Sequence, residues 1–374
     1  MKSSTILFGA ASAAALLATA YGANAQSWAD NTTVSGRIYS DITDISSKVN
    51  GVKTAGAGKQ GVGYDIKRFY IGFDHKFTDN WSTNVTLDNS LITGTGMTTY
   101  LKKAYIQYTA SPALIVSVGA NDLPWVPYSE SIYNYRYLEN TLIDKAGTGT
   151  SADWGVHVAG ALPGGIFSYQ ISAVNGNGYR NPTRQDGFDV ETRLSAKIDQ
   201  WNFAIGTRNG YLGQKFLATS TPTGTTDNQH HKMSRIDALA AYVGDRTRVG
   251  VEYFSSKNGT AAQVALNNPL ITGDADKQEG TSVFGSYRVT PQYTVFARSD
   301  VVKPNQLTNP NRKDTYYNFG ISWNAFKNVD FSLAEKHTES KVGATAINAP
   351  YIPSAIAMSK GVTDEVGVWA QLRY

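Results

Sequence analysis

The chain ends in the sequence DEVGVWAQLRY, residues 364–374, in which apolar and polar residues alternate up to a terminal tyrosine. In an extended strand, successive side chains point to opposite faces. One face of this strand carries Val366, Val368, Ala370, Leu372 and Tyr374. The other face carries Glu365, Gly367, Trp369, Gln371 and Arg373. If such strands close into a barrel in a bilayer, the apolar face meets lipid and the polar face meets a water-filled lumen.

The N-terminal segment has the parts of a secretory signal peptide. A basic start at Met1 and Lys2 precedes an apolar run over residues 6–18, and Ala23-Asn24-Ala25 provides a small-x-small cleavage site. The run is too short to span a bilayer as a helix, and no later stretch approaches ~18 consecutive apolar residues. We therefore predict a signal peptide over residues 1–25, export of the chain, and one mature domain over residues 26–374.

The composition narrows the class of protein. Cysteine is absent, which argues against a disulfide-stapled secreted domain and excludes thiolate chemistry. Removal of Lys2 with the signal peptide reduces the 34 basic side chains to 33, against 30 acidic ones. This excess is too small to indicate binding of nucleic acid. The mean hydropathy of -0.30 suits a soluble protein, but it also suits a barrel that hides only one face of each strand in lipid.

Short and long connections alternate along the chain. Seven tight turns, each followed by an apolar or aromatic strand start, lie at residues 78–80, 111–112, 163–165, 199–200, 244–246, 290–292 and 326–328. Eight long polar loops lie near residues 45–63, 92–98, 122–150, 176–186, 212–233, 258–279, 304–313 and 340–362. These fifteen connections join sixteen strands. We predict an all-β fold, a sixteen-stranded antiparallel transmembrane β-barrel with short periplasmic turns and long external loops.

The two faces of the predicted strands sort aromatic and charged residues. Trp81, Trp201 and Tyr293 each follow a tight turn, where an interfacial aromatic belt is expected. Charged residues are expected to face the lumen, because a charge on the lipid face at mid-depth costs ~2–4 kcal/mol. The basic wall residues are Arg37, Arg68, Lys103, Arg193, Lys197, Arg208, Arg248, Arg288, Arg298, Lys336 and Arg373. The acidic wall residues are Asp41, Asp74, Asp88, Glu191, Glu252, Asp330 and Glu365.

This basic excess on the wall predicts a weak preference for anions, because a basic lining lowers the barrier for anion entry. The alternative is that many of these side chains pair across neighbouring strands and only stiffen the wall.

The third loop, residues 122–150, is the longest connection, and we expect it to fold into the barrel as a constriction. Its aromatic side chains suit packing against an inner wall, and its charges would set the pore size and a transverse field. The predicted constriction residues are Tyr128, Glu130, Tyr133, Tyr135, Arg136 and Glu139. The alternative is an external loop that packs at a trimer interface.

No catalytic site, metal site or cofactor is predicted. The five histidines are scattered, and the adjacent pair His230 and His231 has poor geometry for a tetrahedral metal site. The sequence contains no Gly-x-Ser-x-Gly elbow, phosphate loop or zinc-binding helix motif. We therefore do not expect an enzyme.

Four short segments resemble the phosphate-selective porin (porin O/P-like) family of Gram-negative outer membranes. They are Gly36-Arg37-Ile38, residues 68–73 (RFYIGF), residues 103–108 (KAYIQY) and residues 152–156 (ADWGV). The terminal aromatic residue is also common in outer-membrane barrels. The resemblance implies a trimer of sixteen-stranded barrels, with selectivity carried by wall arginines and a lysine cluster. In the fifth loop, the candidate cluster residues Lys215, His230, His231 and Lys232 are spread apart.

We expect an outer-membrane porin, a passive diffusion channel for small hydrophilic solutes with mild anion preference. Its expected partners are outer-membrane lipid, two further copies in a homotrimer, and small anions or other small hydrophilic solutes, but not nucleic acid. One alternative is a porin selective for phosphate or sugars, with Tyr39, Tyr70 and Tyr105 as a stacking track. The other is a soluble exported β-rich module that binds a ligand or serves a surface structure.

Overall fold

The computed structural model describes residues 25–53, 60–92, 96–184, 186–213, 216–220, 226–230, 232–259, 276–307, 309–342 and 359–374. The predicted signal peptide lies outside these residues except for Ala25, the first residue of helix α2 (Ala25–Asp30). Lys215 and His231 of the fifth loop also lie outside them.

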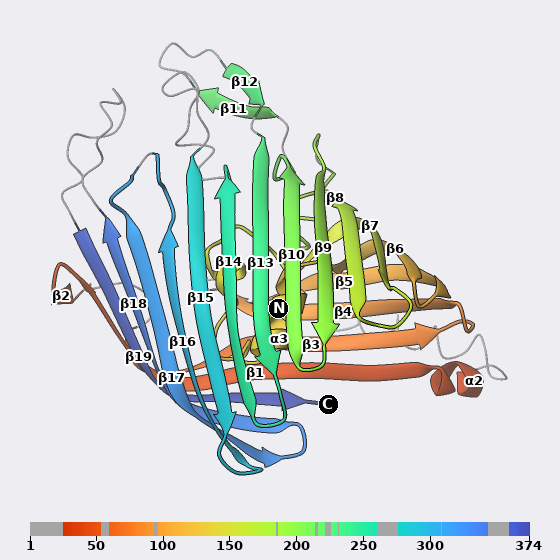
Figure 1. Ribbon diagram of the computed structural model, residues 1–374, viewed down its shortest axis with the longest axis horizontal. Helices are drawn as coiled ribbons and strands as arrows, with labels where there is room; N and C mark the ends of the chain where they lie inside the picture. The colour runs from red at the N-terminus through yellow and green to blue at the C-terminus, as the bar shows by residue number, and fades with distance from the viewer. Residues whose placement is uncertain are drawn as a thin grey trace, which may run out of the picture.

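Sixteen strands of the described residues pair antiparallel, and the last pairs with the first, so the sheet closes into a barrel (Figure 1). The barrel strands are β1 (Thr32–Val49), β3 (Gly61–Lys76), β4 (Trp81–Ile92), β5 (Gly96–Ser111), β6 (Leu114–Asp122), β7 (Ala152–Ala161), β8 (Phe167–Val174), β9 (Asp189–Ile198), β10 (Trp201–Gly210), β13 (Met233–Val243), β14 (Thr247–Lys257), β15 (Lys277–Arg288), β16 (Tyr293–Lys303), β17 (Lys313–Phe326), β18 (Val329–Val342) and β19 (Ser359–Arg373). The predicted fold is confirmed.

The remaining strands are short and lie at the loop end of the barrel. β2 (Val52–Lys53) extends the hairpin that begins with β1. β11 (Phe216–Ser220) and β12 (Thr226–His230) form a separate hairpin beyond the strand ends (Figure 1). Helices α3 (Val126–Tyr133) and α4 (Leu142–Lys145) belong to the connection between β6 and β7.

All seven tight turns occur where the sequence predicts them. The predicted turn positions fall at the junctions β3–β4, β5–β6, β7–β8, β9–β10, β13–β14, β15–β16 and β17–β18. The start of β1 and the end of β19 lie at the same end of the barrel as these turns, because Thr32 is opposite His75 and Leu372 is opposite Val329. The long connections therefore share the other end.

The closing strand pairs with β1 from Arg37 opposite Arg373 to Val49 opposite Gly361. The chain end continues the ladder, because the Gly36 amide donates to the Tyr374 carbonyl at 3.0 Å and the Tyr374 amide donates to the Gly36 carbonyl at 3.1 Å. Gly36 has to lack a side chain here, since an added methyl group would overlap the Tyr374 ring. The last residue thus takes part in closing the barrel.

Removing Tyr374 should lower the yield of folded barrel, because both backbone hydrogen bonds to Gly36 and the ring contact are lost. Tyr374→Phe keeps the backbone bonds and the ring, so it should fold like the parent. The heat-dependent mobility on denaturing gels measures the folded fraction after refolding into lipid. Equal folded fractions for the truncated and parent chains would contradict this role for Tyr374.

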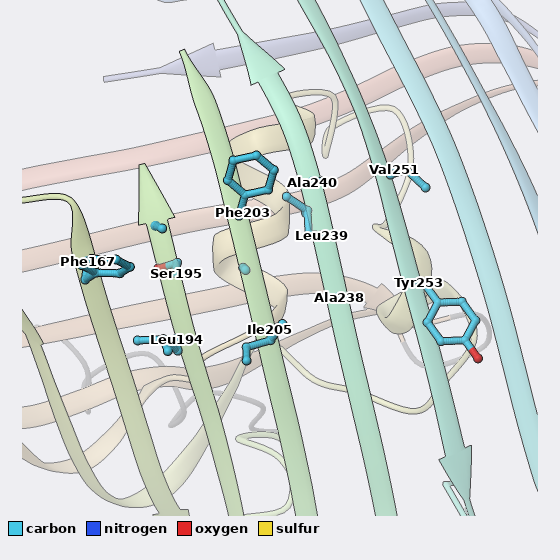
Figure 2. Close-up of a pocket in the computed structure, with 12 residues that line it drawn as sticks. Phe167, Leu194, Ser195, Phe203, Ile205, Ala238, Leu239, Ala240, Val251 and Tyr253 are labelled. Carbon is cyan, nitrogen blue, oxygen red and sulfur yellow. The ribbon is translucent and has the colours of Figure 1, made fainter. Parts of the chain in front are cut away.

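The outward face of the barrel is apolar, as the alternation predicts. Trp81, Trp201 and Tyr293 are exposed on it directly after tight turns. Figure 2 shows one outward groove, in which Ala238 and Ala240 of β13 lie between the larger side chains of Phe203 and Tyr253 on the neighbouring strands. A surface of this kind suits lipid rather than water.

Candidate functional site

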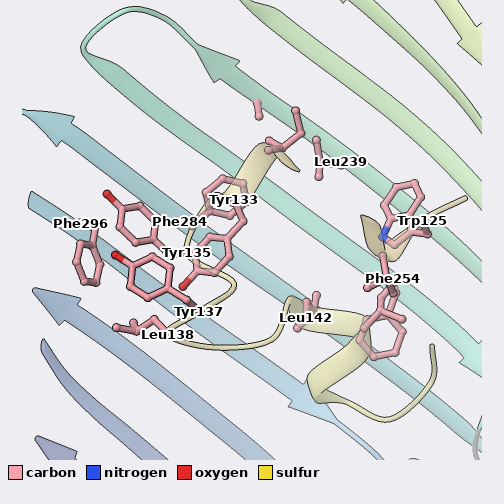
Figure 3. Close-up of a cluster of buried hydrophobic side chains, with 14 of the residues drawn as sticks. Trp125, Tyr133, Tyr135, Tyr137, Leu138, Leu142, Leu239, Phe254, Phe284 and Phe296 are labelled. Atoms are coloured by element: carbon pink, nitrogen blue, oxygen red, sulfur yellow. The ribbon is translucent and has the colours of Figure 1, made fainter. Parts of the chain in front are cut away.

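Loop 3, defined here as residues 123–151, runs inside the barrel rather than over its rim. Trp125, Val126, Leu142 and Ile143 are fully buried, although no other domain covers them. Helices α3 and α4 lie against the inner faces of the strands (Figure 3). The segment predicted as a constriction therefore lies in the lumen, apart from Asp122, which ends β6.

Aromatic contacts hold loop 3 against β1 and the strands from β10 to β19. The Tyr133 ring meets Phe284 edge-on at 5.5 Å, and the Tyr135 ring lies 4.3 Å from Phe296, centroid to centroid. Offset and edge-on aromatic pairs of this kind are favourable beyond the area they bury. The wall partners of the loop cluster are Tyr39, Ala204, Leu239, Ala241, Phe254, Phe284, Phe296, Ala334 and Trp369. Sequence reasoning missed most of these partners, because it treated the luminal face as wet along its whole length.

Among the described residues, six wall side chains donate hydrogen bonds to backbone carbonyls of loop 3. The donor and acceptor residues are Arg193 to Pro124 at 2.7 Å, Arg235 to Thr148 at 2.5 Å, Arg248 to Ile132 at 2.6 Å, Gln278 to Ala146 at 3.3 Å, Arg298 to Asn140 at 2.6 Å and Lys336 to Leu138 at 3.4 Å. Four of the predicted pore-wall cations are among these donors. They satisfy buried carbonyls of an irregular segment, which otherwise would carry unpaired polar groups.

Trp125 is a fully buried anchor of loop 3. Its indole Nε1 donates to Glu252 Oε1 at 2.8 Å, and its backbone amide donates to Glu191 Oε1 at 3.1 Å. Arg235 lies beside this anchor, with Nε donating to Asp237 Oδ1 at 2.8 Å and Nη2 3.3 Å from Glu191 Oε2. These charged groups are all buried. If the guanidinium were removed, water could not take its place as a partner of the carboxylates.

A cavity of about 300 Å³ remains between loop 3, the connection from β8 to β9, and the strands β1, β3, β4 and β18. Its charged lining residues are Lys67, Arg68, Arg136, Arg180 and Lys336, against Asp65 and Glu139. The cavity is the part of the lumen next to loop 3, and five of its seven charged side chains are basic.

Two of the carboxylates that neutralise this cavity, Asp41 and Asp88, are more buried than the cations they bind. Lys67 Nζ lies 2.8 Å from Asp41 Oδ2, with side-chain exposures of 29% and 1%. Arg68 Nη1 lies 3.1 Å from Asp88 Oδ2, with exposures of 18% and 0%. The accessible surface of these pairs is therefore mainly cationic.

The loop side of the cavity carries its own ion pairs. Arg136 Nε donates to Glu130 Oε1 at 2.6 Å. Glu139 lies 3.0 Å from Lys145 and 3.4 Å from Lys336. Burial alone would raise the pKa of Glu139, but Lys336 and Lys145 hold that pKa well below its usual range. The Glu139 carboxylate therefore stays ionised at neutral and mildly acidic pH and keeps loop 3 bound to Lys336 on β18.

Sequence reasoning missed Lys67 and Lys102, because each is an extra residue at a β-bulge. The register of β3 shifts opposite Tyr39 and Ser40, and the register of β5 shifts between Thr86 and Leu87 of β4. A bulge places two consecutive side chains on the same side of the sheet. Lys67 thereby reaches Asp41, and Lys102 lies over the Tyr70 ring at 4.8 Å. The doublets Lys67-Arg68 and Lys102-Lys103 signal such bulges, because strict alternation would put one lysine of each doublet into lipid.

The other predicted wall residues either pair with a neighbouring wall residue or lie near the turns. Lys103 pairs with Asp122 at 2.5 Å, and Asp74 accepts from Asn84 at 2.7 Å. Arg208 is buried against Asp189 at 2.7 Å, as expected for a pair that stiffens the wall. The remaining predicted cations lie toward the turn end, namely Arg37, Lys197, Arg288 and Arg373.

The turn-end arginines border a second cavity of about 380 Å³ below loop 3, lined in part by Arg288, Arg373 and Asp330. Arg373 Nη2 lies 2.7 Å from Asp330 Oδ2, and Arg37 is opposite Arg373 in the ladder. Here too the cations outnumber the carboxylates.

Within the described residues, no helix is long and apolar enough to cross a membrane. The same part of the chain contains no group of three or more His, Cys, Asp or Glu side chains placed to hold a metal ion.

Comparison with known proteins identifies one matching family model. The model, described as phosphate-selective porin O and P, matches residues 33–346. None of the curated proteins matches the sequence.

Solved structures of outer-membrane proteins share the fold at low sequence identity. OmpT of Vibrio cholerae has a TM-score of 0.60 and 11% identity, covering 92% of this chain and 97% of that chain. The trimer form of in-vitro folded OmpT of Vibrio cholerae has a TM-score of 0.57 and 12% identity, covering 92% and 99%. An anion-selective porin from Comamonas acidovorans has a TM-score of 0.58 and 10% identity, covering 92% and 99%.

Proposed function

The chain belongs to the phosphate-selective porin O and P family, and on that premise we propose that loop 3 and the wall facing it form an anion-preferring constriction. The protein is an outer-membrane channel for small hydrophilic solutes. Its family and fold point to a channel rather than to an enzyme. Permeation then depends on the width of the lumen and on the charges that line it.

One observation carries the proposal, namely the five cations and two carboxylates that line the cavity beside loop 3. The carboxylates of Asp41 and Asp88 neutralise part of this positive charge, and they are buried whereas the cations are partly exposed. A permeating ion therefore meets guanidinium and ammonium groups before it meets their counter-ions, which lowers the barrier for anions relative to cations. Because these carboxylates neutralise part of the positive charge, the preference for anions should be mild.

We propose further that the mature protein is a homotrimer, as the trimer form of OmpT of Vibrio cholerae is described. A signal peptide over residues 1–25 would direct the chain to the outer membrane, and Gln26 would begin the mature protein. The anion-selective porin from Comamonas acidovorans has the same fold, and this analogy supports the proposed preference.

Reversal potentials across a planar bilayer in a potassium chloride gradient test the preference, and we expect chloride to be more permeable than potassium. The double variant Lys67→Gln and Arg68→Gln should move the reversal potential toward potassium, because it removes two accessible cations but leaves Asp41 and Asp88.

The matched control is Lys303→Gln with Lys341→Gln, which removes two exposed cations at the loop end. It should leave the reversal potential near that of the parent. A parent channel that favours potassium would overturn the proposed anion preference. Conductance that saturates with added phosphate, but not with chloride, would instead identify a phosphate-selective porin.

A further inference from the structure

A second segment besides loop 3 reaches into the lumen. Loop 4, residues 175–188, connects β8 to β9. Its first turn is built on Asp153, whose Oδ2 accepts from the Gly176 amide at 2.9 Å and from the Gly178 amide at 3.1 Å. Arg208 Nη2 donates to the Gly176 carbonyl at 2.8 Å. Asp153 and Arg208 are both buried, so this turn has a fixed position on the wall.

From this turn, Tyr179 extends to the wall formed by β3 to β5. Its hydroxyl donates to Asp88 Oδ2 at 2.5 Å, and its amide donates to the Ala152 carbonyl at 3.0 Å. Burial and the nearby Asp88 carboxylate raise the pKa of Tyr179 to about 12, so the hydroxyl keeps the proton that it donates. The bond joins residues 91 positions apart in the sequence.

Arg180 is placed next to the lumen by this attachment. Its guanidinium lies 5.0 Å from the centroid of the Tyr100 ring and 5.6 Å from that of Tyr179, and it lines the cavity together with Arg68. Its nearest carboxylate oxygen, Asp88 Oδ2, is 3.6 Å away, beyond hydrogen-bond distance, and its side chain is 39% exposed. Stacking on aromatic rings orients a guanidinium. The Arg180 Nε also donates to the Tyr179 hydroxyl at 3.3 Å, which leaves the two Nη groups as the donors that face the cavity.

Charge is unbalanced at this point of the cavity. Arg68 and Arg180 share one carboxylate, Asp88, which is fully buried and already accepts from Arg68 and Tyr179. A small oxyanion in the cavity could bind both guanidinium groups through separate oxygens. This inference rests on the proposed anion-preferring channel: we propose that Arg180 on loop 4 forms, with Arg68, the anion-binding point within this cavity, and that Tyr179 and Asp88 act as its positioning residues.

Arg180→Gln tests the proposal, and Arg184→Gln is the matched control. Both changes remove one positive charge from loop 4, but Arg184 is exposed and does not line the cavity. We expect Arg180→Gln to reduce the chloride-to-potassium permeability ratio by roughly half, with Arg184→Gln close to the parent. Arg180→Lys keeps the charge and should retain most of the ratio.

Two further variants test the positioning role, because they should shift the ratio in opposite directions. Tyr179→Phe removes the hydroxyl donor and should lower the ratio part of the way, since Arg180 is held less firmly. Asp88→Asn removes the shared counter-charge and should raise the ratio above that of the parent. Heat-dependent gel mobility verifies that each variant forms a barrel.

Equal ratios for Arg180→Gln and Arg184→Gln would overturn this inference, and so would a lowered ratio for Asp88→Asn. The parent channel separates the two proposals. If the parent prefers potassium, the proposed function fails. If the parent prefers chloride and the two arginine variants behave alike, only the role of loop 4 fails.

Discussion

Replacing residues 128–139 by a short glycine-serine linker should at least roughly double the single-channel conductance. This segment contains Tyr133, Tyr135 and Tyr137, which fill the lumen against β15, β16 and β18. The Trp125 anchor and helix α4 lie outside the replaced segment, so the rest of loop 3 keeps its attachments. A wider water-filled cross-section then carries more ions at the same voltage.

Recording single channels of the parent and the variant in planar bilayers at one salt concentration measures this effect. A variant without the β11–β12 hairpin serves as the control, because that hairpin pairs with none of the barrel strands. Its conductance should stay near the parent value. If the loop 3 variant also conducts like the parent, loop 3 does not limit the pore.

Arg235→Met should lower the free energy of unfolding by about 3–5 kcal/mol, because removing one partner of a buried ion pair leaves the others uncompensated. Arg235 and Asp237 side chains are both fully buried, and Glu191 is 1% exposed. The change also removes the donor to the Thr148 carbonyl at the end of loop 3. Loss of the guanidinium therefore weakens both the wall and the anchored loop.

Urea unfolding of the barrel in lipid vesicles measures the change, and Lys303→Met is the control. Lys303 pairs with Glu279 at 3.1 Å, but their side chains are 55% and 35% exposed. An exposed pair of this kind contributes at most about 1 kcal/mol. Equal losses in the two variants would contradict the importance of the buried cluster around Arg235.

The wall cations illustrate how far the candidate site could be predicted. Alternation placed Arg68, Arg193, Arg248, Arg298 and Lys336 on the luminal face, and each of them contacts a luminal partner or loop 3. Their roles differ, because four of these five donate to loop 3 carbonyls, whereas Arg68 lines the remaining opening without such a bond. Period-two alternation identifies a face, but it does not indicate which luminal residues a folded loop will cover.

The doublets Lys67-Arg68 and Lys102-Lys103, like loop 4, show the same limit of prediction from alternation. Lys67 and Lys102 enter the lumen through bulges, which break the alternation that sequence reasoning relies on. Tyr179 and Arg180 lie in a connection that looks like an ordinary external loop, and only the buried Asp153 and Asp88 fix where they point. A polar loop sequence carries no local signal for such distant partners.

By itself, the sequence determined the barrel, its sixteen strands, its seven turns and the closing pair of β19 with β1. Those features follow from a local rule, because each strand separates two media and must alternate apolar and polar side chains. Only the tertiary structure decided which charges line the opening and which hold loop 3. These contacts join residues far apart in sequence, such as Arg298 with Asn140, 158 positions away. Such pairs depend on how an irregular segment satisfies its buried backbone groups inside the closed wall, which no local pattern specifies.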